Sequence, residues 1–196
     1  MTSILKVDQL QDSGGNAIIT SDGAGSITTS SALNTAITNA GFITSGGITE
    51  ADNWRITADI SNPGGFITTN WERSDSTGSG YLGTGMTESS GVFSFPSTGY
   101  YLVSAFGSIK FTSGAHDGAD FSIYATTDNS TYSRTMLSQS SSLTTNYYQA
   151  TAGCMIFDVT NISTHKIKFN CFAPGSLAGS TSENRTHVTF IRLGDT

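Results

Sequence analysis

The sequence predicts an all-β protein, in which an antiparallel sandwich fills the C-terminal two thirds and an extended N-terminal shaft contains one short helix. Two observations predict the sandwich. After residue 66, short segments of alternating apolar and polar residues follow one another, separated by Gly, Pro, Ser and Asn. The 11 Phe, 7 Tyr and 2 Trp residues concentrate after residue 65, so this part of the chain can bury a core.

The strand candidates follow from the period-two alternation of apolar residues. The segment 100–111 is the longest, and a turn through Pro96 and Gly99 leads into it. One face of this segment carries Tyr101, Val103, Ala105, Ile109 and Phe111. The other candidates are residues 66–73, 91–95, 119–126, 147–159, 166–172 and 187–193. Together with the lack of a helical pattern after residue 66, these strands favour one jelly roll over residues 69–196.

The N-terminal third is polar and repetitive, with isolated Ile residues set in Ser, Thr, Gly and Asn. The dipeptide Ile-Thr begins at Ile19, Ile27, Ile37, Ile43, Ile48, Ile56 and Ile67. One such chain cannot bury its Ile side chains alone, whereas three copies around a common axis can. The pattern therefore predicts a homotrimer, with an N-terminal segment over residues 1–20 and a shaft and neck over residues 21–68.

Local patterns predict the elements of this N-terminal part. Residues 3–20 favour two short strands joined by a turn over residues 12–16. Residues 30–41 favour a helix capped by Ser30 or Ser31, and the alternative is a loose turn. The small apolar stripe of this helix predicts a close-packed trimer neck, formed by Leu33, Ala36, Ile37 and Ala40.

Charge and hydropathy exclude several partners. The formal charge is −6, and the 9 Lys and Arg residues form no basic cluster, so we expect no nucleic-acid binding. No apolar run has the length that spans a bilayer, so we expect no membrane insertion. The first eight residues lack the basic start and apolar core of a secretory signal, which predicts synthesis in a cytoplasm.

The two cysteines lie in apolar stretches. If their segments paired as a hairpin with Asp158 opposite Ile167, Cys154 would lie opposite Cys171, and a cross-strand disulfide would be conceivable. The favoured interpretation is two buried thiols in a chain assembled under reducing conditions.

The run from Gly91 to Val103 resembles the strand–turn–strand signature of the complement globular-head and tumour-necrosis-factor-like jelly rolls: Gly, alternating aromatics, Pro, Gly, one residue, then Tyr. The resemblance implies that Phe93 and Tyr101 point into the sandwich, and that residues 188–191 form a strand through its centre. It also implies a compact trimer of jelly rolls with about ten strands each. The shaft lacks the Gly-X-Y collagen repeat of the animal members.

The opening from Ser3 to Asn16 is similar to that of structural and fibre proteins from tailed phages of marine bacteria. In those proteins the N-terminal region attaches to the virion and the C-terminal region faces outward. The resemblance implies that residues 1–20 are the virion-attachment segment, which contacts other virion proteins through the apolar residues Ile4, Leu5, Val7 and Leu10.

The sequence contains no motif typical of an enzyme, a cofactor site or a metal site, so we expect no catalytic residues, cofactor or metal. The acidic residues of the head form no recognisable glycosidase pair. The run from His116 to Asp120 has oxygens for a calcium ion, but an ordinary polar turn is the favoured interpretation.

Aromatic and amide side chains around the Ser-rich segment 138–145 predict a recognition loop for a host-surface glycan or protein. Its candidate residues are Tyr132, Asn146, Tyr147 and Tyr148. The alternative is that Tyr147 and Tyr148 begin a strand and one of them lies in the core.

Together these features favour a trimeric, non-enzymatic fibre or appendage protein on the surface of a phage virion, which adheres to host cells. A capsid decoration or head fibre is an alternative of the same architecture. A glycan-degrading spike is an alternative of another class, and so is a cellular complement-like lectin.

Overall fold

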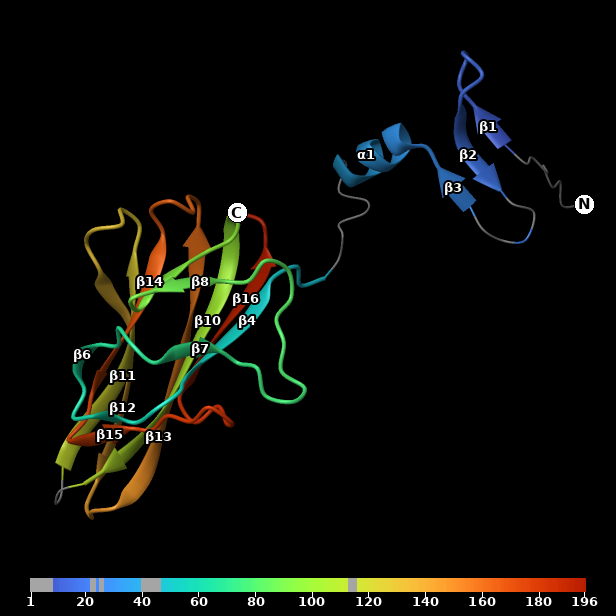
Figure 1. The fold of residues 1–196 in the computed structure, drawn as a ribbon. Helices are drawn as coiled ribbons and strands as arrows, with labels where there is room; N and C mark the ends of the chain where they lie inside the picture. Colours follow the sequence, from blue (N-terminus) through green and yellow to red (C-terminus); the bar gives the residue numbers. More distant parts are fainter. Residues whose placement is uncertain (1–8, 22–23, 25–26, 40–46, 113–115) are drawn as a thin grey trace, which may run out of the picture. The chain divides into compact units, whose positions relative to one another are not determined.

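The computed structural model describes residues 9–21, 24, 27–39, 47–112 and 116–196 (Figure 1). The chain divides into two compact units between Gly47 and Ile48. The second unit is a sandwich of two antiparallel sheets, which confirms the all-β prediction. Among the described residues, no helix has the length and apolarity needed to cross a membrane.

The first unit contains a three-stranded antiparallel sheet and a helix. Its elements are β1 (Gln9–Gln11), β2 (Ala17–Ser21), β3 (Ile27–Thr29) and α1 (Ser31–Asn39). The Asp12 carboxylate shapes the predicted turn between β1 and β2, because it accepts the backbone N–H groups of Gly14 at 2.8 Å and Asn16 at 2.9 Å. The predicted helix is confirmed, and the Ser30 hydroxyl caps it by accepting the Leu33 N–H at 3.2 Å.

The first sheet of the sandwich has seven strands in the order β5-β15-β10-β16-β4-β7, with β13 on the other edge of β10. Its strands are β5 (Ile60–Ser61), β15 (Gly175–Leu177), β10 (Gly99–Phe111), β16 (His187–Gly194), β4 (Ala51–Ile56), β7 (Trp71–Arg73) and β13 (Tyr147–Val159). The predicted central strand is confirmed, since β16 lies between β10 and β4 (Figure 1).

The second sheet has six strands in the order β12-β11-β14-β9-β8, with β6 paired to β14. Its strands are β12 (Ser133–Ser142), β11 (His116–Thr126), β14 (Lys166–Phe172), β9 (Val92–Ser94), β8 (Thr87–Ser89) and β6 (Gly64–Phe66). Predicted and observed bounds agree for β13 and β14, and they differ by a few residues for β9, β10, β11 and β16.

The core lies between the two sheets and is rich in aromatic rings. The five apolar residues predicted for one face of β10 are all buried, with exposed fractions of 2% or less. Phe93 of β9 is fully buried, and its ring centroid lies 5.1 Å from Trp71, 5.4 Å from Phe169 and 5.3 Å from Phe190. These offset and edge contacts join both sheets, so Phe93 and Tyr101 point inward as the resemblance implied.

The boundary predicted between neck and head is wrong for residues 48–68. This stretch belongs to the sandwich, where β4 pairs with β16, β5 with β15, and β6 with β14. Ile56 and Ile67, read as Ile residues of the shaft, are 0% and 3% exposed in the core. The sequence pattern failed because β4 carries the buried charged residues Asp52 and Arg55 where apolar residues are expected.

The register proposed for the cysteines is also wrong. Cys154 of β13 lies opposite Ser104 in the seven-stranded sheet, while Cys171 of β14 lies opposite Phe121 in the six-stranded sheet. Both thiols are free, and Cys171 is buried whereas Cys154 is exposed. The expectation of two buried thiols therefore holds for Cys171 alone.

Candidate assembly face and candidate binding surface

Three neighbouring strands of the seven-stranded sheet, β13, β10 and β16, carry an apolar row on their outer face. Because Tyr101, Val103 and Ala105 point into the core, the alternate residues of β10 point outward. Leu102 lies opposite Ile156 of β13 on one side and Ile191 of β16 on the other. Ile156 is 55% exposed. An apolar row of this kind, crossing three paired strands, is typical of a surface that another chain covers.

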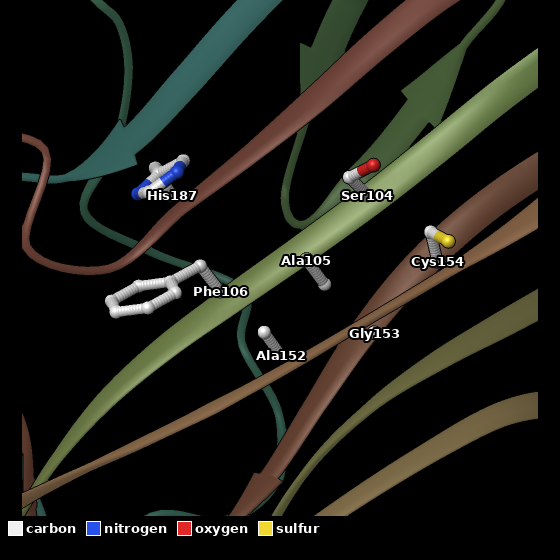
Figure 2. A pocket seen from close by; sticks show the side chains of 7 residues that line it. All are labelled: Ser104, Ala105, Phe106, Ala152, Gly153, Cys154 and His187. Carbon is white, nitrogen blue, oxygen red and sulfur yellow. The ribbon is translucent and has the colours of Figure 1, made fainter.

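The next rows of the same face form a hollow of about 330 Å³. It is lined by Ser104, Ala105, Phe106, Ala152, Gly153, Cys154 and His187 (Figure 2). Phe106 lies opposite His187 of β16, and their rings stack with centroids 5.2 Å apart. The close-up shows these two rings side by side on neighbouring strands (Figure 2). We refer to the outer face of β13, β10 and β16 as the assembly face.

His187 contributes an uncharged ring to this face. Partial burial lowers its pKa, although the Asn184 carbonyl, 3.0 Å from Nδ1, acts in the opposite direction. The imidazole is therefore neutral at pH 7, and the face carries no cation at this position.

The structure does not bring the four predicted recognition residues together. Tyr132 precedes β12, whereas Asn146 follows it, and the ten residues of β12 separate its ends by about 30 Å. Asn146 donates its backbone N–H to the Phe111 carbonyl at 2.7 Å, beside the start of β13. The Ser-rich stretch predicted as a loop is a strand up to Ser142, paired with β11.

Tyr147 and Tyr148 begin β13, as the alternative interpretation held, but neither lies in the core. They are 61% and 49% exposed, and the Lys110 ammonium lies 5.8 Å from the Tyr148 ring centroid. Their role as recognition residues stays a prediction.

The neck and attachment residues are described in part. Leu33 is half-buried in α1, and the backbone of Ala36 and Ile37 lies in the same helix. Leu10 lies in β1 and is 53% exposed. Ala40, Ile4, Leu5 and Val7, together with the side chains of Ala36 and Ile37, lie outside the described residues.

An aromatic and cationic cluster on the outer face of the six-stranded sheet was missed from the sequence, except for Tyr132. Phe66 of β6 packs edge-to-face on Tyr124 of β11, with ring centroids 5.0 Å apart. Phe66 also lies 6.4 Å from the Tyr132 ring. The ammonium of Lys168 lies 5.2 Å from the Phe66 centroid and 4.2 Å from the Tyr132 centroid. We call these four residues the aromatic platform.

The turn before Tyr132 is held by its own hydrogen bonds. The Asp128 carboxylate accepts the backbone N–H of Thr131 at 2.8 Å, the Thr126 hydroxyl at 2.7 Å and the backbone N–H of Ser130 at 2.8 Å, and these bonds lower its pKa. Burial, and then the Asp128 charge, raise the pKa of the Tyr132 phenol, which is therefore protonated at neutral pH. The Tyr132 ring thus follows a turn that these hydrogen bonds hold together.

No group of three or more His, Cys, Asp or Glu residues that could hold a metal ion occurs within the described parts of the chain. In the run from His116 to Asp120, which has oxygens for a calcium ion, the Asp120 carboxylate accepts a hydrogen bond from the Ser122 hydroxyl at 3.1 Å. The side chains of His116 and Asp117 lie outside the described residues.

Two antiparallel sheets with this strand order define a jelly roll of the tumour-necrosis-factor type. No protein-family model and no curated protein sequence matches the chain. Solved structures do match it. Eiger TNF from S. frugiperda has a TM-score of 0.55 at 14% identity, covering 74% of this chain and 93% of that one. Murine APRIL at pH 8.5 has a TM-score of 0.54 at 12% identity, covering 74% of this chain and 98% of that one. At these identities the likeness is one of fold.

Proposed function

We propose that this chain is a non-enzymatic, trimeric appendage protein of a bacterial virus. Its jelly-roll head faces outward and adheres to the host cell surface, while its N-terminal unit attaches to other virion proteins. The mechanism is multivalent adhesion, because three weak sites on one trimer raise avidity without any tight single contact.

The apolar assembly face carries this proposal. A trimer that packs its three copies through this face buries Ile156 and Phe106 and fills the hollow beside His187. The compact trimers implied by the resemblance of residues 91–103 support the same stoichiometry. The separate N-terminal unit supports a division of labour between attachment and adhesion.

The absolute mass of the full-length protein, measured by light scattering after size exclusion, tests the assembly. We expect about three times 20.5 kDa. Ile156→Lys places a charge in the interface and should give monomers, because the ammonium would have to be desolvated.

Phe172→Lys is the matched control. Phe172 is also 55% exposed, but it lies on β14, on the outer face of the other sheet. This variant should remain trimeric. A monomeric wild type would overturn the proposed assembly, and equal loss of the trimer in both variants would place the interface elsewhere.

A further inference from the structure

The aromatic platform combines ring faces with a cation at the surface of a single chain. Phe66 is 42% exposed, and Tyr124, Tyr132 and Lys168 are half-buried. The four residues come from β6, β11, the turn before β12, and β14, so the sheet itself fixes their spacing. Asn170 of β14 lies opposite Phe66 on the same face and adds an amide beside the rings.

Lys168 differs from its neighbour Lys166 in what its ammonium contacts. Lys166 lies on the same face of β14, and its Nζ donates to the Ile162 carbonyl at 2.7 Å. The Lys168 ammonium contacts the ring faces of Phe66 and Tyr132. Among the described residues it makes no hydrogen bond and no ion pair. An ammonium held by rings keeps N–H donors for an incoming acceptor.

We propose that the aromatic platform binds an acidic saccharide. A carboxylate or sulfate group of the saccharide accepts charge-assisted hydrogen bonds from Lys168. The apolar C–H faces of the sugar pack on Phe66 and Tyr132, and Asn170 reaches ring hydroxyls.

The preference of the aromatic platform for an anionic ligand comes from the Lys168 ammonium and not from the charge of the whole chain. The whole chain carries a formal charge of −6, so long-range attraction does not favour a polyanion. The contact with Lys168 must therefore supply the affinity, while the hydrogen bonds of the turn before Tyr132 limit the entropy lost on binding. This inference gives a ligand class to the proposed adhesive function and rests on it, although the site itself needs one chain.

Titration calorimetry of the full-length protein tests this site with four probes of similar length. These are alginate oligomers with carboxylates, carrageenan oligomers with sulfates, neutral maltooligosaccharides, and hexaglutamate, which has carboxylates but no sugar ring. We expect at least one acidic saccharide to bind, with both maltooligosaccharide and hexaglutamate weaker by about tenfold or more. The two acidic saccharides distinguish a carboxylate from a sulfate ligand.

The variants separate a local contact from a general charge effect. Lys168→Met keeps the aliphatic stem on the rings and should weaken binding about tenfold, whereas Lys166→Met should change it less than about twofold. Tyr132→Ala should weaken binding as well. Equal loss in both Lys variants, equal binding of hexaglutamate, or no binding of either acidic saccharide at millimolar concentration would overturn the inference.

The assembly test keeps the two proposals distinguishable. If the monomeric Ile156→Lys variant still binds the acidic saccharide, the site is present in one chain. If the wild type is trimeric but binds none of the probes, the platform is not a saccharide site and the proposed assembly stands.

Discussion

At the scale of single residues, Tyr101 shows how one side chain serves both core and turn. It is 1% exposed, and its ring centroid lies 4.7 Å from that of Phe95. Its hydroxyl, at the far end of the ring, donates to the Ser97 carbonyl at 3.1 Å and contacts the Ser97 hydroxyl at 2.9 Å. The ring thus packs in the sandwich while its hydroxyl secures the turn between β9 and β10.

Tyr101→Ala should therefore lower the free energy of unfolding by about 3–5 kcal/mol, as other large-to-small aromatic changes in cores do. Tyr101→Phe keeps the ring, loses the bonds to Ser97, and should cost about 1 kcal/mol. Urea denaturation followed by fluorescence measures both. A loss below about 0.5 kcal/mol for Tyr101→Ala would contradict the inward facing of β10.

His187 should make stability depend on pH. Its pKa in the folded chain lies below the ordinary value of 6.5, because burial disfavours the imidazolium. As the pH falls, the unfolded chain takes up this proton first. The stabilisation is therefore fully present above the unfolded pKa and decreases as the pH falls through 6.5 towards the folded value.

Urea denaturation at pH 7.5 and pH 5.5 measures this dependence. We expect the wild type to lose more stability between the two pH values than His187→Gln, which lacks a titratable group at position 187 but keeps His116 and His165. The same loss in both proteins would assign the dependence to other groups.

At the scale of elements, β4 and β7 are joined by a buried carboxylate. Asp52 is 3% exposed and accepts the Trp54 indole N–H at 2.9 Å and the Met86 backbone N–H at 2.7 Å. It also pairs with Arg73 of β7 at 3.0 Å. The Arg73 guanidinium in turn lies 4.4 Å from the Tyr81 ring centroid. One acidic side chain thereby connects two strands with the segment that leads to β8.

Asp52→Ala should destabilise the head by about 3–5 kcal/mol, because it leaves the Trp54, Met86 and Arg73 donors without their shared acceptor. The segment between β7 and β8 should also open locally more often in this variant. Hydrogen exchange at the Met86 amide measures it, with Asp59→Ala as a control on an exposed loop. Unchanged Met86 protection would show that other contacts hold this segment.

The elements differ in how well the sequence predicts them, and the difference has a physical cause. β13 and β14 alternate apolar and polar residues between clear turn residues, so their bounds were predicted. β12 was missed because Ser138, Ser140 and Ser142 occupy most of its inward face, with Met136 as the apolar exception. There the Thr151 hydroxyl of β13 donates to the Ser138 hydroxyl at 2.5 Å. The aromatic platform was missed because its members are far apart in the sequence, and pairing of β6 and β11 with β14 assembles them.

At the scale of the whole molecule, the two outer faces of the sandwich have different chemistry. The central rows of the assembly face are apolar, and the charged residues Lys110 of β10 and Asp158 of β13 lie towards its two ends. Such a face suits contact with further copies of the chain. The aromatic platform lies on the outer face of the other sheet, so a trimer formed through the assembly face leaves the three platforms available to ligands. The proposed adhesion depends on this separation, because avidity requires that assembly does not cover the binding sites.

Cys154 reports on the assembly without disturbing it. Its exposed thiol lines the hollow of the assembly face in the single chain, and the proposed trimer covers it. Cys171 is 0% exposed, and burial raises its pKa to about 12, so it stays unreactive in the folded protein. Iodoacetamide followed by intact mass measurement should therefore add no label to the wild type or to Phe172→Lys. It should add one label to monomeric Ile156→Lys. In urea it should add two labels to each of the three proteins.

Iodoacetamide should react with Cys154 more than about tenfold faster in Ile156→Lys than in the wild type. This difference is larger than the increase in thiol reactivity that the screened charge of a nearby exposed Lys can cause. If Cys154 instead reacts equally fast in the wild type and in Ile156→Lys, the hollow is open in the assembled protein. The apolar rows of β10, β13 and β16 would then be a ligand surface, and the chains would have to associate through other strands or through the N-terminal unit.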